Sequence, residues 1–250
     1  MEVFYRVLII IACALVGYIV GSIPNSVVIG KLFFHKDPRE EGSKNPGGTN
    51  AGRVLGRKAG VLVIALDGFK VIIPTYTAFF LFTYCQPLMD LMGHTNEINA
   101  FGVGNTLCQL AVYITALGCI VGHCWSIFLG FKGGKAVSTF FGTACGVTYT
   151  TFLLCGPIFF GTLKWKKHVS FSSLTSTFAF VIYSWILYIV YAITGTDSIV
   201  NYFLYFGQGP SICIYFPIVM TIGFIILYCK HRSNIKRLKE GTESSISWMK

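Results

Sequence analysis

The sequence predicts an all-α integral membrane protein, a polytopic helical bundle in a single domain over residues 1–250. Hydrophobic residues make up 54% of the chain and charged residues only 12%, whereas a soluble domain carries about twice that charged share. Several apolar runs reach the ~20 residues that a helix needs to cross a bilayer. These runs are apolar on all sides, while a soluble protein of this size would show amphipathic stripes.

The expected helices correspond to six apolar stretches, at 7–30, 59–84, 105–127, 136–163, 169–194 and 211–229. The connections between them differ sharply in charge. Basic residues gather in 31–58, in 128–135, in 164–168 and in the tail from Lys230, whereas 85–104 and 195–210 contain no lysine or arginine. Because positive charge favours the cytoplasmic side of a membrane, we expect the N-terminus outside and the C-terminus in the cytoplasm.

The number of times that the stretch 136–163 crosses the membrane decides on which side the later basic segments lie. As one full span it would place both the lysines of 164–168 and the basic tail outside, against the charge rule. Gly142, Gly146 and the Gly156-Pro157 pair interrupt it, and half-helices of ~12 residues reach only ~18 Å of a ~30 Å hydrocarbon core. We therefore predict a re-entrant pair of half-helices at 136–163 within about seven helices, with six full spans as the alternative.

The first polar motif lies in residues 21–60, where Gly21 and Pro24 are expected to loosen the end of the first helix. The segment GSKNPGGTNAGR (42–53) alternates glycine with polar residues and ends on Arg53. Glycine lets backbone N–H groups converge on one point, such nests bind phosphate, and arginine clamps phosphate oxygens bidentately. The candidate binding residues of this segment are Ser43, Asn45, Gly47, Gly48, Thr49 and Asn50; a flexible linker is the alternative.

The second motif is FKGGKAV, in which Lys132 and Lys135 bracket Gly133 and Gly134. It lacks the spacing of a Walker A loop. Exposed glycine N–H groups, two lysine charges and the positive end of a helix starting near Ala136 would all favour a phosphate at the membrane surface. A lysine-rich loop that only anchors the chain on the cytoplasmic side is the alternative.

The third motif is HRSNIKRLKEGTE (231–243), which we expect to continue the last helix up to Gly241. At helical spacing His231 and Asn234 share one face with Ile235 and Leu238, and the other face is a basic strip of Arg232, Lys236 and Lys239. His231 and Asn234 are candidate ligands of a polar site, and a purely structural histidine is the alternative.

Two ionisable residues, Asp67 and Lys70, lie inside the second apolar stretch at positions i and i+3. Charges inside a membrane span are costly and are usually paired or functional. We interpret them as an intrahelical pair near the cytoplasmic end.

The net charge of +10 is typical of cytoplasmic loops beside anionic lipid, with an anionic substrate as the sharper alternative. The basic residues are split among short loops, so we expect no nucleic-acid partner. The sequence shows no metal-ligating cluster, and we expect no metal and no cofactor.

Three long stretches resemble a known family. GSIPNSVVIGKL…GSKNPGGTNAGRVLGRKAG, GHCWSIFLGFKGGKAVST and KHRSNIKRLKEGTE are similar, in order and spacing, to the bacterial acyl-phosphate:glycerol-3-phosphate acyltransferases, the PlsY family. LDGFK (66–70) and HVSFSS (168–173) also resemble the family, and the similarity covers about residues 15–243.

The resemblance implies a bacterial plasma-membrane enzyme with seven helices, two of them short, whose partners are acyl phosphate, glycerol 3-phosphate and membrane lipids. It implies transfer of a fatty acyl group to the 1-hydroxyl of glycerol 3-phosphate, with phosphate released, as the first step of phospholipid synthesis. By motif position it implies that glycerol 3-phosphate is bound by Ser43, Arg53, Lys135, His231 and Asn234, and the donor phosphate by Gly47, Gly48, Thr49 and Asn50. The chain departs from the family pattern at Lys44, Gly48 and Ala136; glycine is common in the family at the first and third of these positions.

The chemistry expected of such a site is electrostatic. An acyl phosphate is already activated, so the enzyme must position two anions and stabilise an oxyanion, and His231, Lys135 and Arg53 are the candidate catalytic residues. We expect a substrate phosphate to take the proton of the attacking hydroxyl, with His231 as the second candidate base. A membrane transporter of phosphate or organic anions is the competing function.

Overall fold

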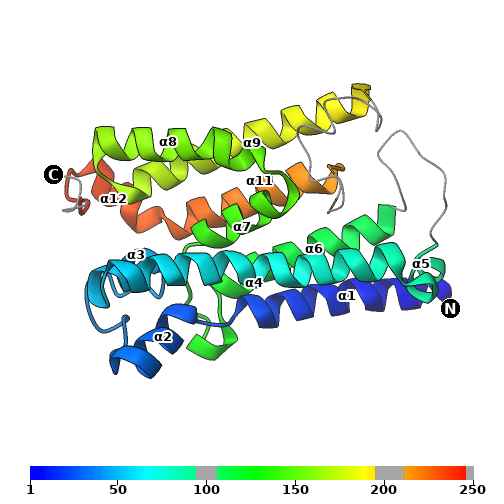
Figure 1. Cartoon of the computed structure of the whole chain (residues 1–250), viewed down its shortest axis with the longest axis horizontal. Coiled ribbons are helices and arrows are strands. Elements are labelled where there is room, and N and C mark those ends of the chain that lie inside the picture. The colour runs from blue at the N-terminus through cyan, green and yellow to red at the C-terminus, as the bar shows by residue number, and fades with distance from the viewer. Residues whose placement is uncertain (94–105, 195–209, 211, 246–250) are drawn as a thin grey trace.

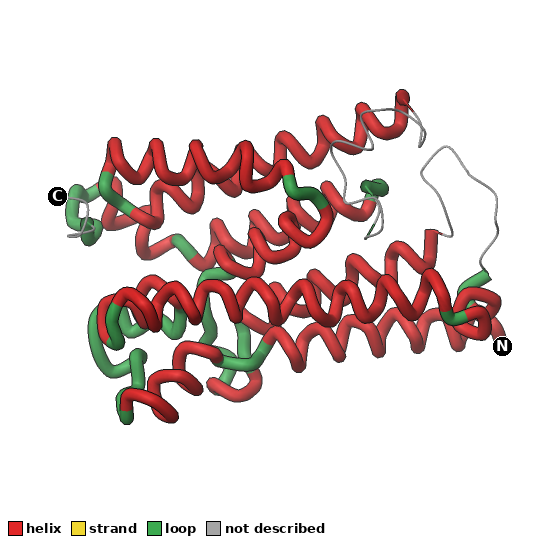
Figure 2. The backbone as a smooth tube through the Cα atoms, viewed as in Figure 1, coloured by secondary structure: helices red, strands yellow, loops and turns green. Residues whose placement is uncertain are grey.

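The structure is a computed structural model that describes residues 1–93, 106–194, 210 and 212–245. Every regular element in these residues is helical (Figures 1 and 2), which confirms the predicted all-α class. The loops expected on the outer side, 85–104 and 195–210, lie largely outside the described residues.

The longer helices are α1 (Glu2–Gly21), α4 (Arg57–Tyr84), α6 (Thr106–Cys124), α8 (Thr150–Lys166), α9 (Val169–Thr194) and α11 (Tyr215–Lys230). The shorter ones are α2 (Asn25–Phe34), α3 (Gly48–Val54), α5 (Gln86–Leu91), the 3₁₀ helix η1 (Ile127–Leu129), α7 (Val137–Val147) and α12 (Arg232–Lys239). Within the described part of the chain, four stretches are long and apolar enough to cross a membrane: Glu2–Phe34, Arg57–Tyr84, Leu107–Leu129 and Val169–Thr194.

The helices form two groups along a common long axis. Helices α1, α4 and α6 lie side by side, and α7, α8, α9 and α11 form the second group (Figure 1). The short helices α2, α3 and α12 gather at one end, while α5 and the start of α1 lie at the other. Helices α1 and α6 approach closely because Gly17 and Gly21 of α1 and Gly118 of α6 have no Cβ. A Cβ at any of these positions would overlap the backbone of the facing helix.

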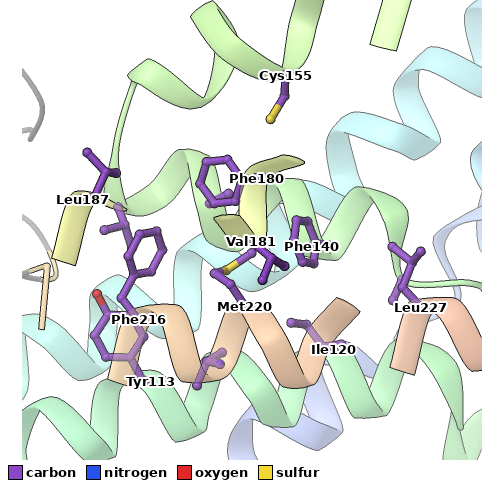
Figure 3. Close-up of a cluster of buried hydrophobic side chains, with 14 of the residues drawn as sticks. Tyr113, Ile120, Phe140, Cys155, Phe180, Val181, Leu187, Phe216, Met220 and Leu227 are labelled. Atoms are coloured by element: carbon purple, nitrogen blue, oxygen red, sulfur yellow. The ribbon is translucent and has the colours of Figure 1, made fainter. Parts of the chain in front are cut away.

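The main core lies between the helices of the second group and α6 of the first. Phe140 of α7 packs edge-to-face on Phe180 of α9, with ring centroids 6.1 Å apart, and Met220 of α11 and Ile120 of α6 belong to the same fully buried cluster (Figure 3). The short helix α7 is therefore enclosed by protein, the setting in which an incomplete membrane helix is tolerated.

The stretch 136–163 is divided into two helices, and α8 returns toward the end at which α7 begins (Figure 1). The expected break at Gly156-Pro157 is wrong, since Pro157 lies inside α8. The chain turns instead at Thr148, which is extended, and whose carbonyl oxygen accepts a bond from Thr151 Oγ1 at 2.7 Å. Threonine side chains often bond to nearby backbone groups in this way and interrupt a helix. The halves have 11 and 17 residues, and their re-entrant placement within a bilayer stays a prediction.

Candidate active site

A basic pocket opens at the end of the molecule that carries α2, α3 and α12. Its volume is about 560 Å³. Six cationic side chains line it, Arg39, Lys44, Lys132, Lys135, Lys230 and Arg237, against the two acids Asp37 and Glu40. Of the predicted site residues, Ser43, Asn45, Gly133 and Lys135 belong to the lining.

Lys135 joins the second and third motifs. Its Nζ donates to Asn234 Oδ1 at 2.6 Å, across 99 positions of sequence. Burial lowers the pKa of Lys135 to about 8; the negative charge of Glu243 opposes this shift, and the positive charges of Arg237, Arg53 and Lys230 reinforce it. Lys135 is thus a cation whose neighbours disfavour its charge, and an arriving dianion would relieve that repulsion.

Glu243 orients Asn234. Its Oε1 accepts from Asn234 Nδ2 at 2.7 Å and from Ser170 Oγ at 2.8 Å, and its Oε2 accepts from Arg237 Nε at 2.7 Å. Burial tends to raise the pKa of Glu243, but these hydrogen bonds outweigh burial and lower it. The arrangement leaves the amide oxygen of Asn234 facing Lys135. Sequence reasoning missed Glu243 and Ser170, although both stand in stretches that resemble the family, because neither shows its partner locally.

His231 is 3% exposed and lies between α11 and α12. Its Nδ1 is 2.8 Å from the carbonyl oxygen of Leu227, so Nδ1 carries the proton and donates, which leaves Nε2 as an acceptor. Burial lowers the pKa of His231 to about 4; the bond to the Leu227 carbonyl opposes the shift and the charge of Lys135 adds to it. The imidazole is therefore neutral at pH 7.

Helix α12 has the two faces that its sequence predicts. His231 and Asn234 are buried and Ile235 and Leu238 are half-buried, whereas the basic strip of Arg232, Lys236 and Lys239 is exposed. The helix ends at Lys239, and Gly241 follows with a φ of +70°. Glycine adopts this left-handed conformation readily after a helix.

Asn50 folds the first motif onto itself. Its Nδ2 donates to the carbonyl oxygen of Pro38 at 2.6 Å, and its Oδ1 accepts from the backbone N–H of Ser43 at 2.7 Å. Gly48 is buried where α3 meets α4, and a Cβ there would overlap Ile64. Asn50 and Gly48 thus shape the loop from behind, whereas Ser43 is exposed at the pocket.

The remaining residues of this motif face outward. Gly47 is the N-cap of α3 and is half-buried, and Thr49 and Arg53 are exposed. Arg53 donates from one terminal guanidinium nitrogen to Ser244 Oγ at 3.1 Å, across 191 positions of sequence. The C-terminal segment therefore connects Arg53 to the Asn234–Glu243 network.

The second motif differs from its prediction. The N–H groups of Gly133 and Gly134 donate to the carbonyl oxygens of Cys124 at 3.1 Å and His123 at 2.9 Å. They cap the C-terminal end of α6, whose last carbonyl oxygens have no partner inside the helix. The expectation that these two N–H groups are free to bind an anion is therefore wrong.

Both glycine-rich loops contain a non-glycine residue in the left-handed region. Lys44 has a φ of +56° and Ala136 a φ of +64°. These are the two positions at which the chain departs from the common glycine of the PlsY pattern. An L-residue in this conformation costs about 1–2 kcal/mol.

The fold and the pocket together define a polytopic helical protein that gathers cations for an anionic ligand at one end of its helices. The family model of glycerol-3-phosphate acyltransferase matches residues 11–241. The chain therefore belongs to the glycerol-3-phosphate acyltransferase family, and it is an integral membrane acyltransferase.

The relatives agree over nearly the full length. Glycerol-3-phosphate acyltransferases from Staphylococcus carnosus (strain TM300) and Staphylococcus haemolyticus (strain JCSC1435) are each 38% identical over 240 residues, which cover 96% of this chain and 99% of theirs. A crystal structure of PlsY, an integral membrane glycerol 3-phosphate acyltransferase, in its glycerol 3-phosphate form superposes with a TM-score of 0.68 at 26% identity, covering 97% of this chain and 96% of that one. A second PlsY structure, in its lysophosphatidic acid form, also has a TM-score of 0.68. These findings favour the enzyme over the transporter.

Proposed function

We propose that the protein transfers a fatty acyl group from an acyl phosphate to the 1-hydroxyl of glycerol 3-phosphate, giving 1-acylglycerol 3-phosphate and inorganic phosphate as the first step of phospholipid synthesis. The observation that carries this proposal is the bond to Asn234 from Lys135, which lines the pocket together with five other cations. The two phosphorylated substrates together carry about four negative charges. The cations that line the pocket would compensate these charges.

Lys135 and Arg53 bind the phosphate of glycerol 3-phosphate, assisted by Ser43 and Asn234. Lys135 supplies a partly desolvated point charge, and Arg53 supplies a planar fork that suits phosphate oxygens. Among the described residues Arg53 bonds to the exposed Ser244, and it can exchange that hydroxyl for a phosphate oxygen.

The donor phosphate lies toward Gly47 and Thr49, which follow the pocket-lining residue Lys44 closely in the sequence. Gly47 precedes α3 as its N-cap, and Thr49 is exposed in the first turn, where its hydroxyl can donate to a phosphate oxygen. Gly133, Gly134, Gly48 and Asn50 contribute by shaping the two loops, because their polar atoms or their available space are already used inside the protein. Asn45 borders the pocket between the two phosphates.

Acyl transfer itself needs no covalent enzyme intermediate. The 1-hydroxyl oxygen attacks the acyl carbon, the bond from that carbon to the phosphate oxygen breaks, and the hydroxyl proton passes to a phosphate oxygen. His231 accepts a hydrogen bond from the hydroxyl at Nε2 and orients it. With a pKa of about 4 it is a weak base, so a His231→Gln enzyme keeps near-normal turnover at saturating substrate. A loss of turnover of about 100-fold or more in this variant would instead make His231 the base.

The pocket faces the cytoplasm of a bacterial cell, the N-terminus lies outside, and α7 and α8 enter and leave the membrane on the cytoplasmic side. The supporting observation is that α12, which contributes Ser233 and Arg237 to the pocket, lies at the end of the molecule opposite to the start of α1 (Figure 1). Labelling of cysteines introduced at the exposed positions Lys44 and Ser233, in a background without native cysteines, tests this orientation. A membrane-impermeant reagent added to intact cells should leave both positions unlabelled; labelling from outside overturns it.

The direct test is an assay of purified protein with palmitoyl phosphate and glycerol 3-phosphate. We expect 1-palmitoylglycerol 3-phosphate and phosphate in equal amounts, and no product when palmitoyl-CoA replaces palmitoyl phosphate. Product from palmitoyl-CoA alone would overturn the proposed donor. Uptake of labelled glycerol 3-phosphate into protein-containing liposomes without any donor would instead indicate transport.

A further inference from the structure

A buried cluster of ionisable side chains lies directly behind the pocket. Asp67 and Lys70 of α4 are 2% and 7% exposed, and His123 of α6 is 7% exposed. The predicted pairing of Asp67 with Lys70 is confirmed by a distance of 2.9 Å between Lys70 Nζ and Asp67 Oδ1. The sequence gives no sign that His123 joins them.

Lys70 uses all three of its protons within the cluster. Its Nζ lies 2.9 Å from Asp67 Oδ1, 2.8 Å from the carbonyl oxygen of Ile23 and 3.0 Å from His123 Nδ1. Because the ammonium group has no acceptor capacity, it donates to His123 Nδ1, and the ring proton of His123 sits on Nε2. Asn25 Nδ2 also donates to Asp67 Oδ1 at 2.9 Å.

The cluster ties four parts of the chain together. Ile23 lies in the break between α1 and α2, where the predicted loosening near Gly21 and Pro24 is confirmed, and Asn25 opens α2. The remaining members come from α4 and α6. Asp67 and Lys70 thus connect the middle of α4 to the pocket-side ends of α1 and α6.

The His123 ring also supports the loop that carries Lys135. A Cβ at Gly134 would overlap Nε2 of this ring, and Gly134 N–H donates to the His123 carbonyl oxygen at 2.9 Å. A cavity of about 10 Å³ lies between the cluster and this loop, and Pro46, Leu129 and Gly133 border both this cavity and the large pocket. The supported glycine directly precedes Lys135 in the sequence.

Stability alone is a poor reason to retain these charges. Replacing a buried ion pair by apolar side chains of similar size is often neutral or stabilising, and ionisable groups in a membrane span are costly. A role in catalysis explains them better, because the cluster contacts the loop that carries Lys135. A displacement of a substrate-binding group by about 1 Å can lower the rate of the reaction by a large factor.

We infer that Asp67, Lys70 and His123 are positioning residues for acyl transfer. They hold the 130–136 loop so that Lys135 Nζ reaches the phosphate of glycerol 3-phosphate. The inference rests on the proposed role of Lys135, and His123 acts through Gly134 without touching either substrate.

Two variants of His123 separate its contacts. His123→Asn places an acceptor where Nδ1 now receives Lys70, but its side chain ends short of Gly134. His123→Gln reaches toward Gly134 and loses the acceptor for Lys70, which keeps Asp67 and the Ile23 carbonyl. We expect His123→Asn to raise the KM for glycerol 3-phosphate about tenfold with kcat within about threefold of wild type, and His123→Gln to change KM by less than about threefold.

Ile120→Val is the matched control. Ile120 is a fully buried residue of α6 that belongs to the main core and not to the loop contact. The loss of one buried methyl group should lower the thermal stability slightly and leave the KM for glycerol 3-phosphate unchanged. An equal rise of KM in this control would overturn the inference, because general loosening would then explain both variants.

The contact itself is tested by coupling to Gly134→Ala. In the wild-type background the added methyl overlaps the imidazole, and we expect a rise of KM of about tenfold or more. In the His123→Asn background the same methyl has room, so its further effect should fall below about threefold. If the double variant instead shows a rise of KM equal to the product of the two single-variant rises, the inference is overturned.

Hydrogen exchange gives a readout that does not need activity. The Gly134 amide should exchange faster in His123→Asn than in Ile120→Val, with Asp67→Asn as the substitute variant if His123→Asn does not fold. Unchanged exchange overturns the positioning role even if the wild-type enzyme acylates glycerol 3-phosphate. Faster exchange in a protein that shows no acyl transfer from acyl phosphate keeps the positioning role and rejects the proposed function.

Discussion

The two glycine-rich loops of the pocket look alike in sequence and are built differently. The 130–136 loop is fixed between two helices: Gly133 and Gly134 cap α6, and Lys135, a half-buried cation, lies two residues before the start of α7 at Val137. In the 42–53 segment Asn50 bonds to backbone groups of the loop and Arg53 reaches Ser244, while Ser43, Lys44, Thr49 and Arg53 are exposed.

The comparison shows what glycine does in each loop. At Gly134 and Gly48 the missing Cβ allows close packing, against the His123 ring and against Ile64 of α4. At neither position is the main role of glycine to expose a backbone N–H group to a ligand. The 130–136 loop therefore offers one rigid, desolvated charge, whereas the 42–53 segment offers several solvated groups that can adapt to a ligand.

The largest expected effect is at the rigid loop. Lys135→Met should lower kcat/KM for glycerol 3-phosphate about 100-fold, because truncating one partner of a buried, charge-assisted hydrogen bond costs ~2–5 kcal/mol. Lys132→Met is the control, since Lys132 is exposed in the same loop, and should cost less than about fivefold. Similar losses of kcat/KM in both variants would show that the buried and the exposed lysine contribute equally, which would contradict this comparison. Steady-state kinetics with palmitoyl phosphate in excess measures both.

The packing role of glycine in α3 gives a second test. Gly48→Ala should lower the free energy of unfolding by about 1–3 kcal/mol, because the new Cβ overlaps Ile64. Gly52→Ala, one turn later, meets Gly60 Cα at an ordinary 3.6 Å and should be neutral or slightly stabilising. Thermal unfolding in detergent compares the two, and equal losses would contradict the packing explanation.

Arg53→Ala tests the adaptable segment. It should raise the KM for glycerol 3-phosphate about tenfold with little change in kcat, because an exposed cation adds mainly to binding. Lys58→Ala, an exposed cation near the start of α4, is the control and should leave KM unchanged. An unchanged KM in Arg53→Ala would remove Arg53 from the site.

The lowered pKa of Lys135 predicts a pH dependence. With a pKa of about 8, the charged form is lost as pH rises, so kcat/KM for glycerol 3-phosphate should fall about threefold between pH 7.5 and 8.5. Phosphate monoesters are already dianionic there, so the substrate adds no inflection. Lys135→Arg, which stays charged, should remove the decline; a decline that persists in Lys135→Arg belongs to another group.

The smallest effect concerns the strained positions. Lys44→Gly should raise the free energy of unfolding by about 0.5–1 kcal/mol, because the left-handed penalty exceeds the entropy cost of a glycine. Ala136→Gly should gain less, since Ala136 is fully buried and its methyl also fills space. Denaturation of the purified variants measures the difference, and destabilisation by Lys44→Gly would show that its φ carries no strain.

Composition and spacing alone determined the helical membrane class, the position of the polar motifs and the two faces of α12. These features are readable because membrane crossing depends on runs of local hydrophobicity, and because side chains three and four apart share a helix face. The resemblance of three motifs in order to the PlsY family was equally a property of the linear chain.

Only the tertiary structure decided how the site residues are used. The turn at Thr148, the capping of α6 by Gly133 and Gly134, and the Glu243 carboxylate behind Asn234 depend on partners distant in sequence or on local hydrogen bonds that no residue pattern revealed. A backbone N–H or a carboxylate looks the same in the sequence whether it faces a ligand or another part of the chain. Its role is fixed by which acceptor or donor the packed helices bring within ~3 Å.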